Sequence, residues 1–178
     1  MKLSEKDYFA GNFKLASANG QTFETVSVLK LGSKEDFSSI KNAAKEKLNL
    51  IEFDAAFAGC APDDFDESFL ASLREVLKEA ENSGAVFCIK PVLQVSSINS
   101  EEDLENITAL FYHIARRIKD CACVAGFALP EMGADTQKCA VSLIEALKKK
   151  PPEYVYILSS MDFASALNET YQARLACY

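Results

Sequence analysis

Polar side chains follow several apolar runs of this chain, and they are the first candidates for chemistry. Asp54, Lys90, Gln94 and Glu131 each come at or just after the end of such a run. In parallel α/β proteins, ligands bind at the carboxyl ends of the strands, where loops and helix N-termini meet. Asp54 and Glu131, with Lys90 nearby, would support general acid–base chemistry if burial and mutual repulsion separated the two carboxyl pKa values. The alternative is that these are solvated loop residues and helix caps, the commonest use of Asp in such positions.

We therefore expect Glu131 as the catalytic residue and Asp54, Lys90 and Gln94 as ligand-binding residues. The most informative geometric question is whether one pocket gathers Asp54, Lys90 and Glu131. Further polar residues stand in comparable positions after a run, namely Lys30, Ser33, Cys60, Asp63, Asp64, Ser159, Ser160 and Asp162.

Other chemistries are excluded by counting. His113 is the only histidine, so a multi-histidine metal site is excluded, and a Ser-His-Asp triad would have to use this one residue. It lies within a helical pattern, where we expect a surface or helix-flank role. The chain has neither Gly-x-Gly-x-x-Gly nor Gly-x-x-x-x-Gly-Lys-Ser/Thr, so the usual phosphate cradles are missing. We predict no metal and no cofactor.

The cysteines suggest structural thiols. Several of the six lie inside apolar patterns, where a free cysteine behaves as a small buried hydrophobe. Cys121 and Cys123 are two residues apart, which is not the spacing of a zinc knuckle or a Cys-x-x-Cys redox pair. We expect one of them to be buried and the other exposed.

The length and net charge of the chain limit the number of domains and the classes of partner. With 178 residues the chain can build one sizeable core, so we predict a single α/β domain over residues 1–178. A net charge of -7 leaves no basic surplus for nucleic acid or for an anionic membrane surface. No apolar stretch approaches the ~20 residues of a membrane span. Charged residues within Met1 to Ala10 interrupt any secretory apolar region, so we expect a cytoplasmic protein.

Five apolar runs, each followed by helical spacing, predict about five βα units with a parallel sheet. The expected strands are 23–31, 48–57, 85–93, 123–129 and 154–159. Helices are expected after Ser33, after Asp64 to Asp66, after Ser100, before Lys148 to Lys150, and from Asp162 through Tyr171 and Leu175. An open, flavodoxin-like three-layer α/β/α sandwich remains the alternative to a barrel-related arrangement.

The order of several segments resembles the N-terminal part of the cellulase-type (β/α)₈ glycoside hydrolases. Ala18 to Phe23 resembles the lead-in to their first strand, and Ser33 to Phe37 followed by Leu48 to Phe53 resembles their first helix and second strand. Phe65 to Lys90 is similar to the stretch that precedes their third strand. Tyr112 to Ile118 followed by Val124 to Leu129 resembles their helix and fourth strand. The resemblance covers roughly residues 10 to 160. It implies a TIM-barrel-related but truncated fold, with Glu131 aligned to the catalytic acid.

The departures from that family's motifs point to lost hydrolysis. The family's Asn-Glu-Pro corresponds to Pro130-Glu131-Met132, Glu52 stands where the family has arginine, and residues 90–93 contain no histidine. Retaining hydrolysis also needs a nucleophile about 5 Å from the acid, which the family takes from a late strand. We therefore expect a glycoside-hydrolase-like domain without self-contained activity, a pseudoenzyme that binds a carbohydrate or other small polar ligand.

Two alternatives stay open. One is an active glycosidase-like hydrolase or other enzyme whose site is completed across a homodimer. The other is a protein-interaction module, because five units of a barrel would leave open edges and an uncovered inner face that must be paired or hidden.

Overall fold

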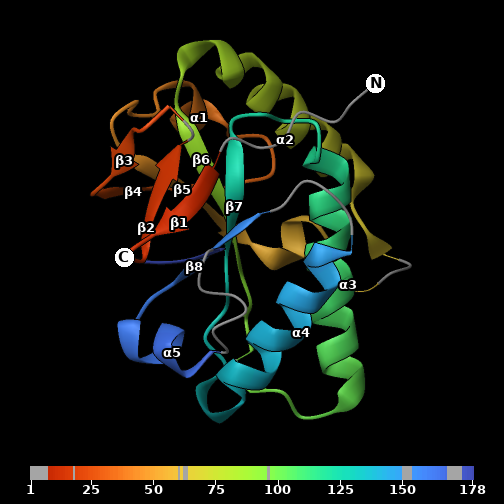
Figure 1. The fold of residues 1–178 in the computed structure, drawn as a ribbon. Coiled ribbons are helices and arrows are strands. Elements are labelled where there is room, and N and C mark those ends of the chain that lie inside the picture. The colour runs from red at the N-terminus through yellow and green to blue at the C-terminus, as the bar shows by residue number, and fades with distance from the viewer. Residues whose placement is uncertain are drawn as a thin grey trace.

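The computed structural model describes residues 8–17, 19–59, 61, 64–95, 97–149, 154–167 and 174–178. An antiparallel sheet of three strands opens the chain, with β1 (Tyr8–Gly11), β2 (Lys14–Ser17) and β3 (Thr22–Phe23). A parallel sheet follows, with β4 (Val26–Lys30), β5 (Leu48–Asp54), β6 (Val86–Val92), β7 (Val124–Ala128), β8 (Val155–Leu158) and β9 (Leu175–Cys177). Figure 1 shows the two sheets and the helices around them.

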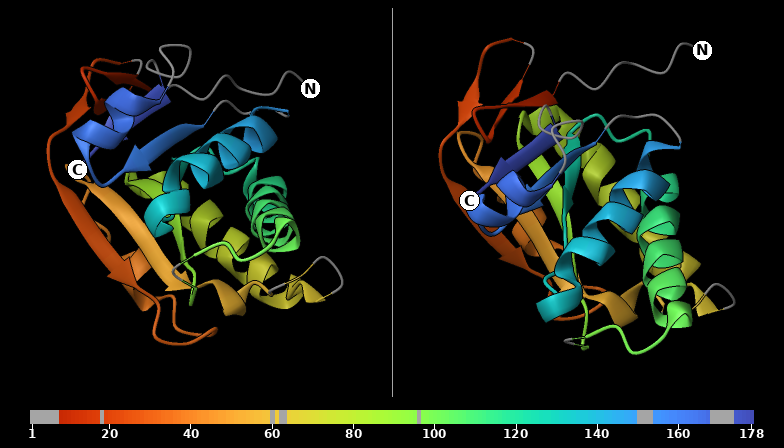
Figure 2. Two further views of the ribbon diagram at one scale, coloured as in Figure 1. Left: turned by 90° about the horizontal axis from the view of Figure 1, so that it is seen from below. Right: turned by 60° about the horizontal axis from the view of Figure 1, so that its bottom comes forward.

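The parallel sheet confirms the predicted barrel-related arrangement. Its strand order is β4-β5-β6-β7-β8-β9, so each strand pairs with its sequence neighbour. The sandwich alternative is wrong, because a doubly wound sheet reverses its strand order and carries helices on both faces. Here the helices α2 (Glu67–Ala80), α3 (Glu101–Ile118) and α4 (Thr136–Lys148) lie on one side of the sheet and the N-terminal strands on the other (Figure 2).

Local signals place the two longest helices, α2 and α3. Asp66 caps α2 by accepting a hydrogen bond from the Phe69 backbone N–H. Ser100 and Asp103 form a reciprocal capping box at the start of α3. The apolar stripes predicted for these helices are buried against the sheet, including Leu73, Leu77, Phe111 and Ile114. The caps therefore explain where α2 and α3 begin, and the apolar stripes explain which side of each helix packs against the sheet.

The first and last predicted helices are shorter than expected. α1 (Ser38–Lys41) and α5 (Met161–Ala166) are single short segments, and α5 is capped by Ser160 instead of Asp162. The extension of the fifth helix to Leu175 is wrong, because Leu175 begins β9 and pairs in parallel with Tyr156 of β8. Short apolar runs do not distinguish a helical turn from a buried strand. Tyr171 lies outside the described residues.

The N-terminal sheet covers part of the inner face of the parallel sheet. Ala10, Leu15 and Phe23 form one buried cluster with inward-facing residues of the parallel strands, namely Leu48, Leu50, Val86, Cys88, Ala125, Ala128, Val155, Ile157 and Ala176. The expected uncovered inner face is therefore wrong for this region. Strands of two to four residues carry too little periodicity to be recognised beforehand.

The two ends of the described chain are joined. The Leu15 N–H donates to the Tyr178 hydroxyl oxygen at 2.8 Å, and that hydroxyl donates to the Phe23 carbonyl at 2.6 Å. At the outer edge of β9, the Cys177 N–H donates to the Phe13 carbonyl at 2.8 Å. Phe13 and Asn12 form the β1–β2 turn with positive φ values of 57° and 48°. The turn therefore occupies a backbone donor of the β9 edge.

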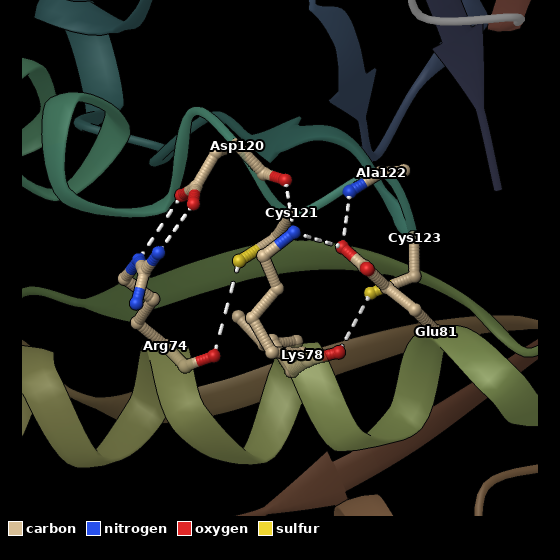
Figure 3. A network of polar contacts seen from close by, with 8 residues as sticks. Arg74, Lys78, Glu81, Asp120, Cys121, Ala122 and Cys123 are labelled. Carbon is tan, nitrogen blue, oxygen red and sulfur yellow. Dashed lines mark hydrogen bonds and ion pairs between the residues drawn. The ribbon is translucent and has the colours of Figure 1, made fainter.

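The cysteines of the described residues are buried, namely Cys88, Cys121, Cys123, Cys139 and Cys177. Cys60 lies outside the described residues. The expected exposure of either Cys121 or Cys123 is wrong, because their thiols point toward the carbonyls of Arg74 and Leu77 on α2 (Figure 3). No helix in the described part of the chain has the length and apolar character needed to cross a membrane.

A polar network fastens α2 to the turn before β7. Arg74 makes a two-pronged ion pair with Asp120, and Lys78 contacts both the Asp120 carbonyl and Glu81 (Figure 3). The same Glu81 oxygen, Oε1, also accepts from the Ala122 N–H at 2.7 Å. This network lies where β7 begins, whereas the predicted site lies where the strands end.

Candidate functional site

Three charged side chains form a row across three neighbouring strands. Lys30, Glu52 and Lys90 are in register with one another across β4, β5 and β6. Side chains alternate between the faces of a sheet, so Glu52 and Lys90 project to the same face as Leu50 and Cys88, which is the inner one. The N-terminal sheet packs against those earlier residues. The row therefore lies farther along the same face, toward the carboxyl ends of the strands.

Both oxygens of Glu52 are engaged by lysines. Oε1 lies 3.1 Å from Lys30 Nζ, and Oε2 lies 2.8 Å from Lys90 Nζ. The hydrogen bond from Lys90 lowers the pKa of Glu52, Lys30 acts in the same direction, and partial burial opposes them. The Glu52 side chain is 17% exposed, against 75% for Lys30 and 41% for Lys90. One ionised carboxylate is thus shared by two more accessible ammonium groups.

Asp54 ends β5 and has two hydrogen-bonding roles. One carboxylate oxygen accepts from the Ala56 N–H at 2.9 Å, which caps the short 3-10 helix η1 (Ala55–Phe57). The other oxygen accepts from Gln94 Nε2 at 2.9 Å. The cap expected as the alternative role is present, and the second oxygen brings Asp54 and Gln94 together from adjacent strand ends.

A pocket of about 260 Å³ opens beside the Asp54–Gln94 pair. It lies between the segments after β5 and β6 and the first turns of α3, and its lining comprises Asp54, Ala55, Ala56, Gly59, Leu93, Gln94, Val95, Asn99, Asp103, Asn106, Ile107 and Leu110. Carboxylate and amide groups stand next to aliphatic side chains in this lining. A small ligand with hydroxyl groups and an apolar face suits this combination.

Glu131 stands apart from these contacts. It follows β7 in the segment before the 3-10 helix η4 (Gly133–Asp135), and its side chain is exposed. Within the described residues Glu131 makes no hydrogen bond or ion pair. The structure thus joins Asp54 to Gln94 and Lys90 to Glu52, and no such contact links Glu131 to either pair.

Sequence reasoning missed the role of Glu52 as the centre of the row. A signal was present, because Lys30, Glu52 and Lys90 are each the fifth residue of their strand and each interrupts an apolar run. Asn99, Asp103 and Asn106 were also missed, and only the packing of α3 beside Asp54 brings them into the pocket lining.

His113 lies on the flank of α3, as expected. Its ring stacks on Phe65 with centroids 4.1 Å apart, and its Nε2 lies 3.0 Å from a Glu67 oxygen. Arg117 pairs with the other oxygen of Glu67. These contacts join α3 to the start of α2. Among the described residues, no group of three or more His, Cys, Asp or Glu side chains is placed to hold a metal ion.

Comparison with known proteins gives matches in structure only. No family model and no curated protein sequence matches the chain. Among solved structures, a GH5_18 protein from Bifidobacterium longum subsp. infantis matches with a TM-score of 0.57 at 11% identity, covering 78% of this chain and 44% of that one. The endoglucanase Cel5A of Pseudomonas stutzeri matches with a TM-score of 0.56 at 13% identity, covering 81% and 48%.

A third match is the exo-β-1,4-mannosidase Op5Man5 of Opitutaceae bacterium strain TAV5. Its TM-score is 0.58 at 13% identity, with 89% of this chain and 34% of that chain covered. The fold is a partial cellulase-type (β/α)₈ barrel. This confirms the resemblance at the level of fold, and the chain spans less than half the length of the structures it matches. In this partial barrel, Asp54, Gln94 and the charged row lie toward the carboxyl end of the sheet, where barrels of this type place their ligands.

Proposed function

We propose that the partial barrel binds a carbohydrate, or another small polar ligand, at the carboxyl ends of β5 and β6. The observation that carries the proposal is the Asp54–Gln94 hydrogen bond at the mouth of the 260 Å³ pocket. A carboxylate and an amide held together offer both acceptors and donors to neighbouring hydroxyl groups. Leu93, Ile107 and Leu110 supply the apolar surface against which the C–H face of a sugar ring would pack.

We further propose that the domain does not hydrolyse glycosides by itself. Retaining hydrolysis requires two carboxyl groups about 5–5.5 Å apart on either side of the scissile bond. Glu131 is exposed and makes no hydrogen bond or ion pair among the described residues. Nothing there holds its carboxyl group in one orientation, as a general acid requires.

The test is a titration of the ¹⁵N-labelled protein with a panel of neutral mono- and disaccharides, followed by amide chemical shifts. Gln94→Ala removes the amide of the pair and should weaken binding about three- to tenfold, the effect of one lost hydrogen bond. Gln21→Ala is the matched control, because Gln21 is also exposed but contacts the Lys45 carbonyl near the start of β5. It should leave the affinity unchanged.

The results of the titration distinguish a binding domain from an active hydrolase. Absence of binding across the panel rejects the proposal, and equal weakening by Gln21→Ala and Gln94→Ala rejects the site. Turnover of a glycoside by the wild-type protein that Glu131→Gln abolishes would instead support an active hydrolase.

Homodimerisation is the second candidate, and β4 is the observation that favours it. Within the described residues β4 pairs only with β5, and Val28 at its centre is 48% exposed. A strand edge with an exposed valine is a surface that a second copy can cover. Sedimentation velocity should then show a dimer that Val28→Lys converts to a monomer. A concentration-independent monomer in the wild-type protein would reject this candidate.

A further inference from the structure

The row of Lys30, Glu52 and Lys90 carries a charge pattern that the proposed function does not explain. The three residues occupy the same level on adjacent strands, between the apolar inner residues and the strand ends. Exposed ion pairs contribute little to stability. Stability alone is therefore a weak reason to place three charges within strands that are otherwise largely apolar.

The charges in the row do not balance. Two ammonium groups face one carboxylate, and each lysine takes a different oxygen of Glu52. An ammonium group has three N–H donors, so each lysine keeps two donors after its bond to Glu52. The row therefore holds one surplus positive charge and several unused donors, in a chain whose net charge is -7.

The row and the proposed ligand pocket lie toward the same ends of β5 and β6, although none of the three row residues lines the pocket. Glu52 and Asp54 are two residues apart on β5, a separation of about 7 Å along a strand. Lys90 lies in β6, and Gln94 follows two residues after the end of that strand. Side chains two residues apart start from the same face of a strand, so Asp54 links the pocket on the α3 side to the face that carries the row. A ligand of one or two sugar rings bound to Asp54 and Gln94 would approach the lysines by passing over the ends of β5 and β6.

We propose that the natural ligand is an anionic carbohydrate whose carboxylate or phosphate group binds between Lys30 and Lys90. This inference rests on the proposed carbohydrate site and names its substrate class. Glu52 engages one donor of each lysine and so competes with a bound anion for the two ammonium groups. The remaining donors make charge-assisted hydrogen bonds to the anionic group, which are stronger than bonds between neutral partners.

The experiment compares glucose, glucuronic acid, glucose 6-phosphate and inorganic phosphate by NMR titration. At low salt, the preferred anionic sugar should bind about tenfold more tightly than glucose, and added salt should reduce the gain. Glucuronic acid and glucose 6-phosphate distinguish a carboxylate from a phosphate ligand.

Two variants test the assignment to the row. Lys30→Met with Lys90→Met removes both ammonium groups at similar side-chain length and should abolish the preference for the anionic sugar over glucose. Lys45→Met with Lys47→Met is the control, because both lysines are exposed just before β5 begins and the change in charge is the same. It should retain most of the preference.

Glu52→Gln provides a test that structural disruption would not mimic. It removes the internal competitor for the two lysines, so the ratio of the affinity for the anionic sugar to the affinity for glucose should rise several-fold. Weaker binding of the anionic sugar by this variant would overturn the inference.

The failures are distinguishable. Equal affinity for glucose and both anionic sugars overturns the inference and leaves the carbohydrate site standing. Inorganic phosphate binding as tightly as glucose 6-phosphate overturns it in favour of nonspecific anion binding. Absence of binding by any sugar removes both the inference and the proposed function.

Discussion

Removing the Tyr178 hydroxyl should loosen the N-terminal sheet from the parallel sheet. Tyr178 accepts a hydrogen bond from Leu15 of β2 and donates one to the Phe23 carbonyl of β3. Tyr178→Phe keeps the ring but leaves both backbone groups without this partner in a largely buried interface. Each orphaned group costs about 1–3 kcal/mol when fully buried. Tyr178 is only partly buried, so we expect the lower part of the combined range, a loss of about 2–4 kcal/mol in the free energy of unfolding.

Equilibrium urea denaturation followed by circular dichroism measures this loss. With a urea dependence of about 2 kcal/mol per molar, the midpoint should fall by roughly 1–2 M. Tyr154→Phe is the comparison, because the Tyr154 hydroxyl donates to the Ala115 carbonyl over a longer 3.2 Å. Its loss should be nearer 1 kcal/mol. A Tyr178→Phe loss no larger than that of Tyr154→Phe would refute the role assigned to this contact.

Alkaline pH gives an independent test of the same hydroxyl. Burial raises the pKa of Tyr178 to about 12, above the ordinary value of about 10. Because the folded state holds this proton more tightly than the unfolded state, the associated stability is present below pH ~10 and is lost as the pH rises toward 12. The stability of Tyr178→Phe should therefore fall less steeply over this range. Parallel curves for the two proteins would contradict the assignment.

Three further predictions concern packing, acid stability and thiols. Gly126→Ala should cost more than about 3 kcal/mol in a thermal melt, because the new Cβ would lie 1.7 Å from the Val155 carbonyl oxygen, whereas Gly32→Ala meets nothing within 4 Å and should be nearly neutral. The Lys34 ammonium holds the pKa of Asp66 well below its usual range, so the associated stability is present at neutral pH and is lost on acidification. In Asp66→Asn, the urea midpoint should therefore fall less steeply as the pH is lowered. An unchanged fall would exclude this ion pair as the source of the acid sensitivity. In Cys60→Ser, a thiol reagent should react with five cysteines only after denaturation, and rapid reaction of the native protein would contradict their burial.

Much of the outer half of the fold could be predicted from local patterns. The strands that begin near Leu48, Val86 and Val124 are near-continuous apolar runs, which is typical of a parallel sheet covered on both faces. Asp66 and Ser100 predict the starts of α2 and α3, because a side-chain acceptor at that position satisfies backbone N–H groups that the first turn of a helix leaves without a partner. These signals act within a few residues and need no tertiary contact.

The candidate site was only partly predictable. Asp54, Lys90 and Gln94 follow from the rule that strand ends carry ligands, but their partners do not. Glu52 became the partner of Lys90 only through the register of β5 and β6, a pairing across 38 positions of sequence. Sequence position alone also grouped Glu131 with Asp54 and Lys90, and no hydrogen bond or ion pair among the described residues supports that grouping.

The amino-acid sequence by itself determined the alternation of strands and helices, the helix starts and the polar character of the strand ends, because propensity, capping and periodicity are local. Only the tertiary structure decided what covers the inner face and how the edge of β9 is occupied. Those answers depend on contacts such as Leu15 with Tyr178, 163 residues apart. Their energy is gained only after the whole sheet has brought both partners together, so no window of the sequence contains it.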